Sequence, residues 1–178
     1  WIASLTDATL YYHQWSTSTV TTEFDGTAVK VSLTDKENDE IYDMALKNPD
    51  LSGMGTTAVA VLLKENTAVI AHIGDSRAYK IAEGITQITT DHSVVQSLIE
   101  DGKLTPEEAK FHPRKNVITR AIGVEENISV DFDEVSLSEG EHLLLCTDGL
   151  TNFVDADCIK EIFDKYKGFV LVASEMEM

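Results

Sequence analysis

Two aspartates that follow apolar runs are the residues best placed to do chemistry. Asp75 lies in the sequence Ile-Gly-Asp-Ser-Arg after the run 67–72, and Asp148 lies in Cys-Thr-Asp-Gly-Leu after the run 142–145. A carboxylate at the point where a strand ends can present its oxygen atoms to a metal ion or a substrate at the rim of a sheet. Each aspartate alone is more typical of a turn than of a metal site, because Asp-Ser and Asp-Gly pairs accept turn backbone angles. The functional interpretation therefore rests on the two motifs together and on their surroundings.

Short strands joined by tight turns are expected to position both aspartates. Runs of apolar and β-branched residues alternate with turn residues, which is typical of an antiparallel sheet. Nearer the N-terminus, 20–24 and 27–33 predict a hairpin with the two-residue turn Asp25-Gly26. The other expected strands are 57–63, 68–73, 78–81, 87–89, 128–135 and 141–146.

Helices are expected to flank these strands. The first opens at a capping box formed by Thr34 and Glu37 and closes at Asn48-Pro49. Later helical patterns cover 93–100 and 106–111, the second with Thr105 as N-cap, and a last helix begins at 155 or 156. The residues expected on buried faces are Ile41, Met44, Ala45 and Leu46 in the first helix and Ile159, Ile162 and Phe163 in the last.

Composition narrows the class of protein. The 178 residues, 43% hydrophobic and 7% aromatic, suit one globular domain. With 14 basic and 31 acidic side chains the formal charge is −17, which disfavours nucleic acid and anionic membranes as partners and can assist divalent cation binding. No apolar run is long enough to cross a bilayer, so we expect a cytoplasmic protein. Cys146 and Cys158 have no metal-type spacing and are expected to be reduced, buried thiols.

Several basic side chains also invite a functional interpretation. The guanidinium groups of Arg77 and Arg120 can each hold phosphate oxygen atoms in a bidentate manner. Arg77 stands at a strand end, which favours a structural salt bridge. The histidines favour structural roles, and His72, within a strand, is expected to bond a backbone group.

The order of motifs resembles the bacterial branch of the PP2C (PPM) family, the metal-dependent protein serine/threonine phosphatases. The resemblance covers roughly residues 36–165, whereas 1–35 and the last dozen residues show none that we identify. The motifs that carry it, in order, are Ser-Gly-Met-Gly-Thr-Thr-Ala-Val (52–59), the Asp75 motif (73–77), Thr-Asp-His-Ser-Val-Val-Gln (90–96), Leu-Thr-Pro-Glu-Glu-Ala (104–109), His-Pro-Arg-Lys-Asn-Val-Ile-Thr-Arg-Ala-Ile-Gly (112–123) and the Asp148 motif (146–150).

The resemblance implies an α+β fold, an antiparallel β-sandwich flanked by helices. It also implies a mobile flap at about 91–123, with His92, Ser93 and Arg120 on the side facing substrate. In these terms 1–35 is a β-rich N-terminal segment of unclear origin within the same domain, and 36–178 is the phosphatase core.

The resemblance further implies a site for two or three Mn²⁺ or Mg²⁺ ions. It assigns Asp148 to the central site and Asp75 to a third, weaker one. Family motifs of the Asn-Glu-Asp and Asp-Gly-Met-Gly-Gly types and a C-terminal Asp-Asn pair have no counterpart here, and Ser52 stands where an aspartate would precede Gly-Met-Gly. The chain therefore looks truncated or remodelled at both ends. The absent ligands would come from residues such as Asp7, Asp25 or Asp35, or from a second chain.

Two functions of different class follow. In the first, the protein hydrolyses phosphoserine or phosphothreonine in proteins by means of a metal-activated water. In the second, it is a catalytically silent module that keeps the fold to bind a phosphoprotein or a Ser/Thr kinase. An incomplete version of an active enzyme is a third possibility. Sheet edges left open by missing strands would favour self-association.

Overall fold

A computed structural model of the chain describes residues 2–3, 20–24, 29–33 and 35–166, and within these it contains helices and antiparallel strands. The α+β prediction is confirmed. The strands are β1 (Ile2–Ala3), β2 (Val20–Phe24), β3 (Val29–Leu33), β4 (Ala58–Lys64), β5 (Thr67–Ile73), β6 (Arg77–Ile81), β7 (Ile85–Gln87), β8 (Asp131–Ser136) and β9 (His142–Cys146). The helices are α1 (Asp35–Lys47), the 3₁₀ helix η1 (Pro49–Leu51), α2 (Val94–Glu100), α3 (Pro106–Ala109), α4 (Asp148–Thr151) and α5 (Ala156–Lys165).

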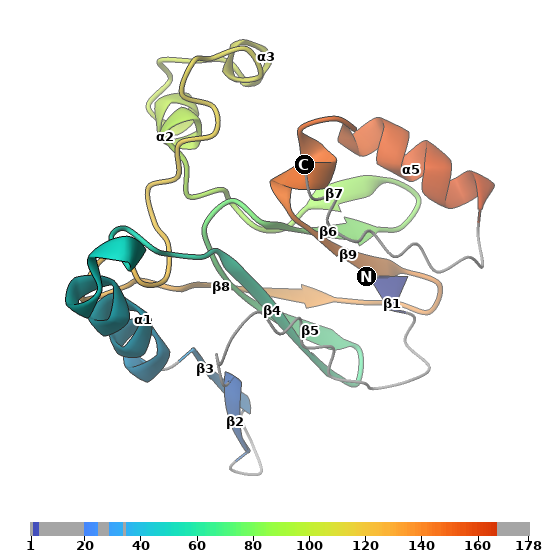
Figure 1. Cartoon of the computed structure of the whole chain (residues 1–178). Helices are drawn as coiled ribbons and strands as arrows, with labels where there is room; N and C mark the ends of the chain where they lie inside the picture. Colours follow the sequence, from blue (N-terminus) through green and yellow to red (C-terminus); the bar gives the residue numbers. More distant parts are fainter. Residues whose placement is uncertain (1, 4–19, 25–28, 34, 167–178) are drawn as a thin grey trace.

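Two antiparallel sheets form the body of the molecule. One has the strand order β1-β9-β6-β7, the other has β4-β5-β8, and β2 and β3 pair separately. A shared apolar core joins the two sheets, since Ile70 of β5 packs in one cluster with Ala78 of β6 and Leu143 of β9. In Figure 1 the arm that carries α2 and α3 projects away from both sheets.

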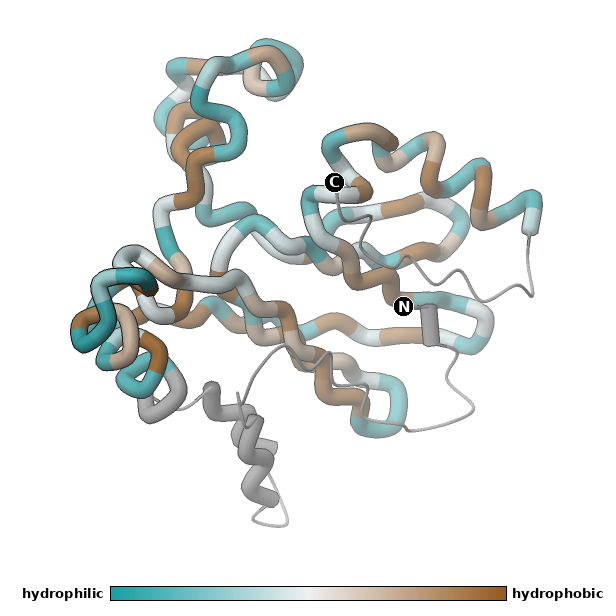
Figure 2. The backbone as a smooth tube through the Cα atoms, viewed as in Figure 1, coloured by the Kyte–Doolittle hydropathy of each residue, from teal (hydrophilic) through white to brown (hydrophobic). Residues whose placement is uncertain are grey.

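The second core lies on the other face of the β6–β9 pair. Leu144 points opposite to Leu143, as strand alternation requires, and packs with Tyr79 and with Ile159 of α5. Figure 2 shows apolar residues along the strands and on α2 and α5, with hydrophilic residues in the turns. Among the described residues, no helix is long and apolar enough to cross a membrane.

The N-terminal hairpin is confirmed, but its turn differs from the expectation. Phe24 pairs with Val29, so four residues separate the paired ends. A two-residue Asp25-Gly26 turn would pair Phe24 with Thr27, and that prediction was wrong. The turn residues themselves, and the Thr34 cap, lie outside the described residues.

Three burial predictions for helix residues were also wrong. On α5, Ile162 was expected on the buried face and is 42% exposed. On α1, Met44 and Leu46 are 53% and 67% exposed. The buried face of the helix is narrow because it follows Asn38, Ile41 and the half-buried Ala45, and side chains at 44 and 46 point about a quarter turn or more away from it.

The two cysteines are free, as expected, but they are not buried. Cys158 is exposed and Cys146 is half-buried. Cys158 lies in the first turn of α5 beside Ile159, which takes the position facing the sheet. Burial raises the pKa of the Cys146 thiol to about 11, which keeps it protonated.

Candidate active site

The strand register brings Asp75 and Asp148 to the same edge of one sheet. Arg77, the first residue of β6, lies opposite Cys146, the last residue of β9. Asp75 is two residues before Arg77 and Asp148 is two residues after Cys146. Because the strands are antiparallel, both carboxylates leave the sheet at the same end. The prediction that the two motifs form one site gains this geometric support.

The backbone around Asp75 is fixed by close packing. Gly74 has φ +104°, and a Cβ atom there would lie 2.3 Å from Cγ2 of Thr57, so only glycine fits. The hydroxyl groups of Thr57 and Ser76 are hydrogen-bonded at 2.9 Å. Asp75 is thus held between two tightly fixed neighbours.

Asp75 is the carboxylate of the site whose pKa is shifted from its ordinary value. Burial raises the pKa of Asp75, and the nearby carboxylates of Asp148 and Asp91 raise it further. Asp148 is exposed, begins α4, and accepts a hydrogen bond from Nδ2 of Asn152 at 3.0 Å. A hard divalent cation prefers oxygen ligands, and it is attracted to a place where negative charges lie together. The Asp75–Asp148 pair therefore fits such an ion.

Asp91 is the third carboxylate of the group, and Arg77 occupies it. Nε and Nη2 of Arg77 donate to Asp91 at 2.8 and 2.6 Å. The expected structural salt bridge of Arg77 is confirmed. Asp91 itself was missed as a member of the site, although it lies in the motif Thr-Asp-His-Ser.

His92 connects the Asp75 loop with the base of the flap. The ring is 3% exposed, and its Nδ1 accepts a hydrogen bond from the N–H of Gly74 at 3.0 Å. The main-chain N–H of His92 donates in return to the carbonyl of Gly74 at 2.9 Å. Because a backbone N–H only donates, Nε2 carries the proton of the neutral ring and points at Asp131, 3.2 Å away.

His72 lies against His92, with ring centroids 4.7 Å apart. Its Nε2 bonds the carbonyl oxygen of Thr90 at 2.9 Å, so the expected backbone partner is confirmed. Atoms of His72, His92 and Asp131 lie within 4.8 Å of one another, a spacing that suits a metal ion. The tautomer argues against it, because the protonated Nε2 of His92 has no lone pair to offer.

Arg120 and Ser93 complete the base of the flap. Arg120 donates to the Asp131 carboxylate at 2.7 and 3.3 Å and to the carbonyl of Ser129 at 3.2 Å. The hydrogen bonds that Asp131 accepts from Arg120 and from His92 lower the pKa of its carboxyl group. Ser93 is 2% exposed and caps α2 by accepting from the N–H of Gln96. Asp131, which holds both His92 and Arg120, follows no motif and was not anticipated.

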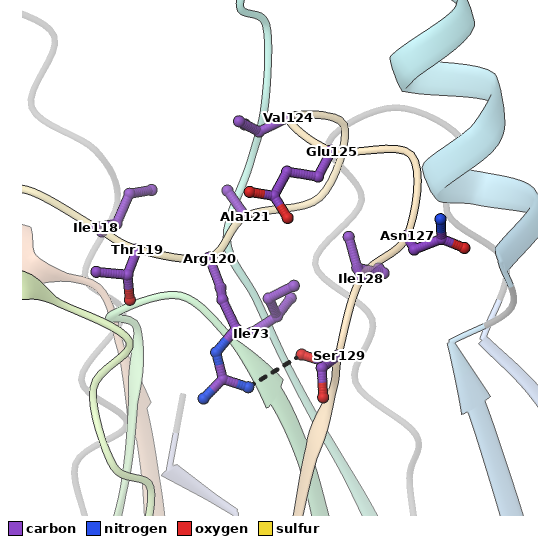
Figure 3. Close-up of a pocket in the computed structure, with 10 residues that line it drawn as sticks. All are labelled: Ile73, Ile118, Thr119, Arg120, Ala121, Val124, Glu125, Asn127, Ile128 and Ser129. Atoms are coloured by element: carbon purple, nitrogen blue, oxygen red, sulfur yellow. Dashed lines mark hydrogen bonds between the residues drawn. The ribbon is translucent and has the colours of Figure 1, made fainter. Parts of the chain in front are cut away.

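Backbone pairing closes the flap into a loop with a narrow base. The N–H of Thr119 donates to the carbonyl of His92 at 2.8 Å, and that of Val94 donates to Val117 at 2.9 Å. Next to this base lies a pocket of about 210 Å³, with Ile73, Arg120 and Glu125 in its wall. Figure 3 shows Arg120 at one end of the pocket and Val124 at the other. Neither Asp75 nor Asp148 lines it.

The profile of the family described as protein phosphatase 2C matches residues 11–176. The chain belongs to the protein phosphatase 2C family. The match begins inside the segment 1–35, where the motifs alone showed no resemblance. The division into 1–35 and 36–178, with a flap at 91–123, stays a prediction.

Characterised members of the protein phosphatase 2C family resemble the chain closely over part of their length. "Protein phosphatase PhpP" of Streptococcus pneumoniae serotype 2 is 45% identical over 127 residues, which cover 71% of this chain and 51% of the relative. The crystal structure of the serine/threonine phosphatase Stp1 from Staphylococcus aureus matches with a TM-score of 0.72 and 41% identity over 76% of this chain and 54% of that one. A structure of the catalytic domain of the phosphatase PstP in complex with two manganese ions matches with a TM-score of 0.63 and 37% identity, over 71% and 53%. The chain spans about half the length of the curated relatives it matches.

Proposed function

We propose that this member of the protein phosphatase 2C family is, or is part of, a metal-dependent protein serine/threonine phosphatase. Its metal site would include Asp75 and Asp148. The observation that carries the proposal is their common edge. The register of β6 and β9 directs both carboxylates there, and the pKa of Asp75 is raised by burial and by the nearby carboxylate of Asp148. Two like charges held together in this way favour a cation between or beside them.

Mn²⁺ and Mg²⁺ are the ions that this oxygen-donor pair would hold, and the PstP relative is described with two manganese ions. When bound, such ions make a water molecule acidic enough to attack phosphorus and neutralise charge on the phosphate oxygens. The residues of the chain would bind the metal ions and hold the ligating carboxylates in place. Asp148 is steadied by Asn152, and Asp75 is held in place through Gly74 and Ser76.

The flap residues have positioning roles in this proposal. His92 ties the Asp75 loop to the flap base, and Ser93 caps α2. Arg120 is engaged by Asp131 and stands beside the pocket at the flap base. Binding of a substrate phosphate by Arg120 would therefore require it to leave Asp131.

A silent binding module remains the second candidate, for one specific reason. Among the described residues, Asp91 is the only further carboxylate that acts on Asp75 beside Asp148, and it is already paired with Arg77. Divalent cation affinity rises with the number of charged ligands. If no further carboxylate joins them, the site would hold a metal ion only weakly, and the protein would bind a phosphorylated partner through other residues without hydrolysing it.

Phosphoproteins are the substrates that family membership supports, and a cognate Ser/Thr kinase and a cytoplasmic location stay predictions. Self-association is also proposed. Among the described strands, β4 and β8 each pair only with β5, and an open strand edge favours pairing with another chain. Sedimentation at micromolar concentration tests this, and a clean monomer would contradict it.

Hydrolysis of a small aryl phosphate and of a phosphothreonine peptide, with and without Mn²⁺, tests the proposed activity. The expected result is metal-dependent turnover that is lost in Asp148→Asn. Asp50→Asn is the matched control, because Asp50 is an exposed acid in η1. Folded protein without any turnover would favour the silent module.

A further inference from the structure

Positive charge is concentrated in one segment of this acidic protein. The segment 110–120 contains Lys110, Arg114, Lys115 and Arg120 and no acidic residue, whereas the whole chain has a formal charge of −17. The segment follows α3 and returns to the base of the flap. The segment 110–120 therefore bears a local charge opposite to that of the whole protein.

Three of these cations form no salt bridge with a carboxylate of the described residues. Lys110, Arg114 and Lys115 make no ion pair with any carboxylate in the part of the chain that the structure describes. Acidic side chains outnumber basic ones by more than two to one in the chain, with 31 against 14, and most other described cations are paired. Among the described residues, salt bridges to carboxylates are formed by Lys47, Arg77, Lys80, Lys103, Arg120 and Lys160.

The backbone of this segment holds the three cations on an exposed surface. Successive turns run through it, with the N–H of Lys115 donating to His112 and that of Val117 donating to Arg114. Lys110, Arg114 and Lys115 are all exposed. Between them, Phe111 is 87% exposed. The segment thus presents an aromatic side chain among exposed positive charges.

One residue of the cationic segment, Lys110, lies near the start of α5. Lys110 is near enough to Asp155 to contribute to the lowered pKa of that carboxyl, whose main cause is the hydrogen bond from the N–H of Cys158. Asp155 caps α5, directly after the short α4 that Asp148 begins. In Figure 1 the α2–α3 arm projects on the same side of the sheets as α5. A peptide that is bound at Asp148 and Asp75 and runs along α4 toward Asp155 would therefore reach Lys110, the first cation of the segment.

We propose that Lys110, Arg114 and Lys115 form a docking surface for acidic residues that flank the phosphorylated residue of a peptide substrate. The inference rests on the proposed phosphatase function and adds a substrate class to it. A substrate with Asp, Glu or a second phosphate near its phosphorylated residue gains contacts with these cations. Phe111 supplies apolar contact to the same peptide.

An acidic peptide fits this surface better than a larger polyanion. Three exposed cations are few, and the surrounding charge of −17 repels nucleic acid and anionic membranes. A short peptide contacts the flap within a Debye length, about 10 Å at 0.1 M salt, and avoids most of that repulsion. The attraction is between exposed groups and should weaken as salt rises.

The test measures binding in metal-free protein by fluorescence anisotropy, so that it does not depend on turnover. Two labelled phosphothreonine peptides of equal length are compared, one with Asp and Glu on both sides and one with Ser and Gly. We expect the acidic peptide to bind about tenfold more tightly at low ionic strength, as a few exposed charge pairs allow. The preference should disappear in the combined variant Lys110→Gln, Arg114→Gln and Lys115→Gln.

Lys103→Gln is the matched control, because Lys103 lies in the same arm but is paired with Asp101 at 2.7 Å. It should retain the preference. Circular dichroism and thermal melting establish that each variant is folded. With active protein, the ratio of kcat/KM for the two peptides should fall in the triple variant by the same factor as the binding ratio.

Three results would overturn the inference. The first is a triple variant that prefers the acidic peptide as strongly as the wild type does, and the second is a wild type with no preference between the two peptides. The third is tighter binding of the wild type to anionic vesicles or single-stranded RNA than to the acidic peptide. The proposed phosphatase function fails independently, through absent turnover. Acid-selective binding without turnover would support the docking surface alone, and turnover without selectivity would support only the phosphatase.

Discussion

The imidazole of His92 accepts a hydrogen bond from the N–H of Gly74, at 3.0 Å, directly before Asp75. This bond couples a proposed metal ligand to the base of the flap, because the same ring donates to Asp131 and the backbone of His92 pairs with Thr119. The position of Asp75 therefore depends on a side chain that lies 17 residues later in the sequence.

Removing that ring should destabilise the protein. In His92→Ala the N–H of Gly74 loses its acceptor in a buried position, and we expect the free energy of unfolding to fall by about 2–3 kcal/mol. His92→Asn keeps an acceptor near the position of Nδ1 and should lose less. Urea denaturation of the two variants measures the difference, and equal losses would show that Gly74 does not depend on this acceptor.

Stability should fall as the pH drops from about 7.5 to 5.5, through the ordinary range of histidine. Burial lowers the pKa of His92 in the folded protein. As the pH falls below the ordinary pKa, His92 binds a proton in the unfolded chain but stays neutral in the folded protein. The stabilisation present above the ordinary pKa is therefore lost as the pH falls toward the pKa of the folded protein.

The non-titrating His92→Asn should flatten this pH dependence, whereas His112→Gln, a change in the flap, should preserve it. Urea midpoints across the pH range provide the measurement. An unchanged slope in His92→Asn would assign the effect to another group.

Asp75→Asn should have opposite effects without and with metal. Without metal it removes a half-buried charge and its repulsion from Asp148, so the free energy of unfolding should rise by about 0.5 kcal/mol. With Mn²⁺ the wild type gains stability from binding and the variant gains less. Melting curves with and without Mn²⁺ decide, and an equal Mn²⁺-dependent shift in both proteins would exclude Asp75 from the site.

Gly74→Ala tests how tightly the Asp75 loop is packed. The new methyl group would lie 2.3 Å from Cγ2 of Thr57, and φ is +104°, so we expect a loss of about 3 kcal/mol or more. Gly84→Ala is the control, because no atom lies within 4 Å of a Cβ there. Similar melting temperatures for the two variants would contradict the described packing.

Local sequence patterns predicted most elements because their determinants are local. The Thr105 and Glu108 capping box of α3 is present with both hydrogen bonds, and the β4–β5 hairpin forms around residues 65 and 66. Burial on α1 was predicted less well. Its inner face is set by distant contacts, in which Asn38 donates to the carbonyls of Glu125 and Glu126 and accepts from Gly123. No periodicity within the helix contains that information.

The site shows the same division. Asp75 and Asp148 were predicted from motifs at strand ends, and the register of β6 and β9 brings them to one edge. Asp131 was not found, because its importance comes from contacts with His92 and Arg120 that only the folded chain creates. Asp91 lies in a motif but is defined by its pairing with Arg77.

Mn²⁺ binding to Asp148→Asn tests the central claim most directly. Calorimetric titration of the folded wild type should show Mn²⁺ binding that weakens by about tenfold or more in Asp148→Asn and also in Asp75→Asn, because each removes one charged ligand of a shared site. Asp50→Asn should bind as the wild type does. Unchanged Mn²⁺ affinity in both Asp148→Asn and Asp75→Asn would contradict the assignment of these carboxylates as a metal site.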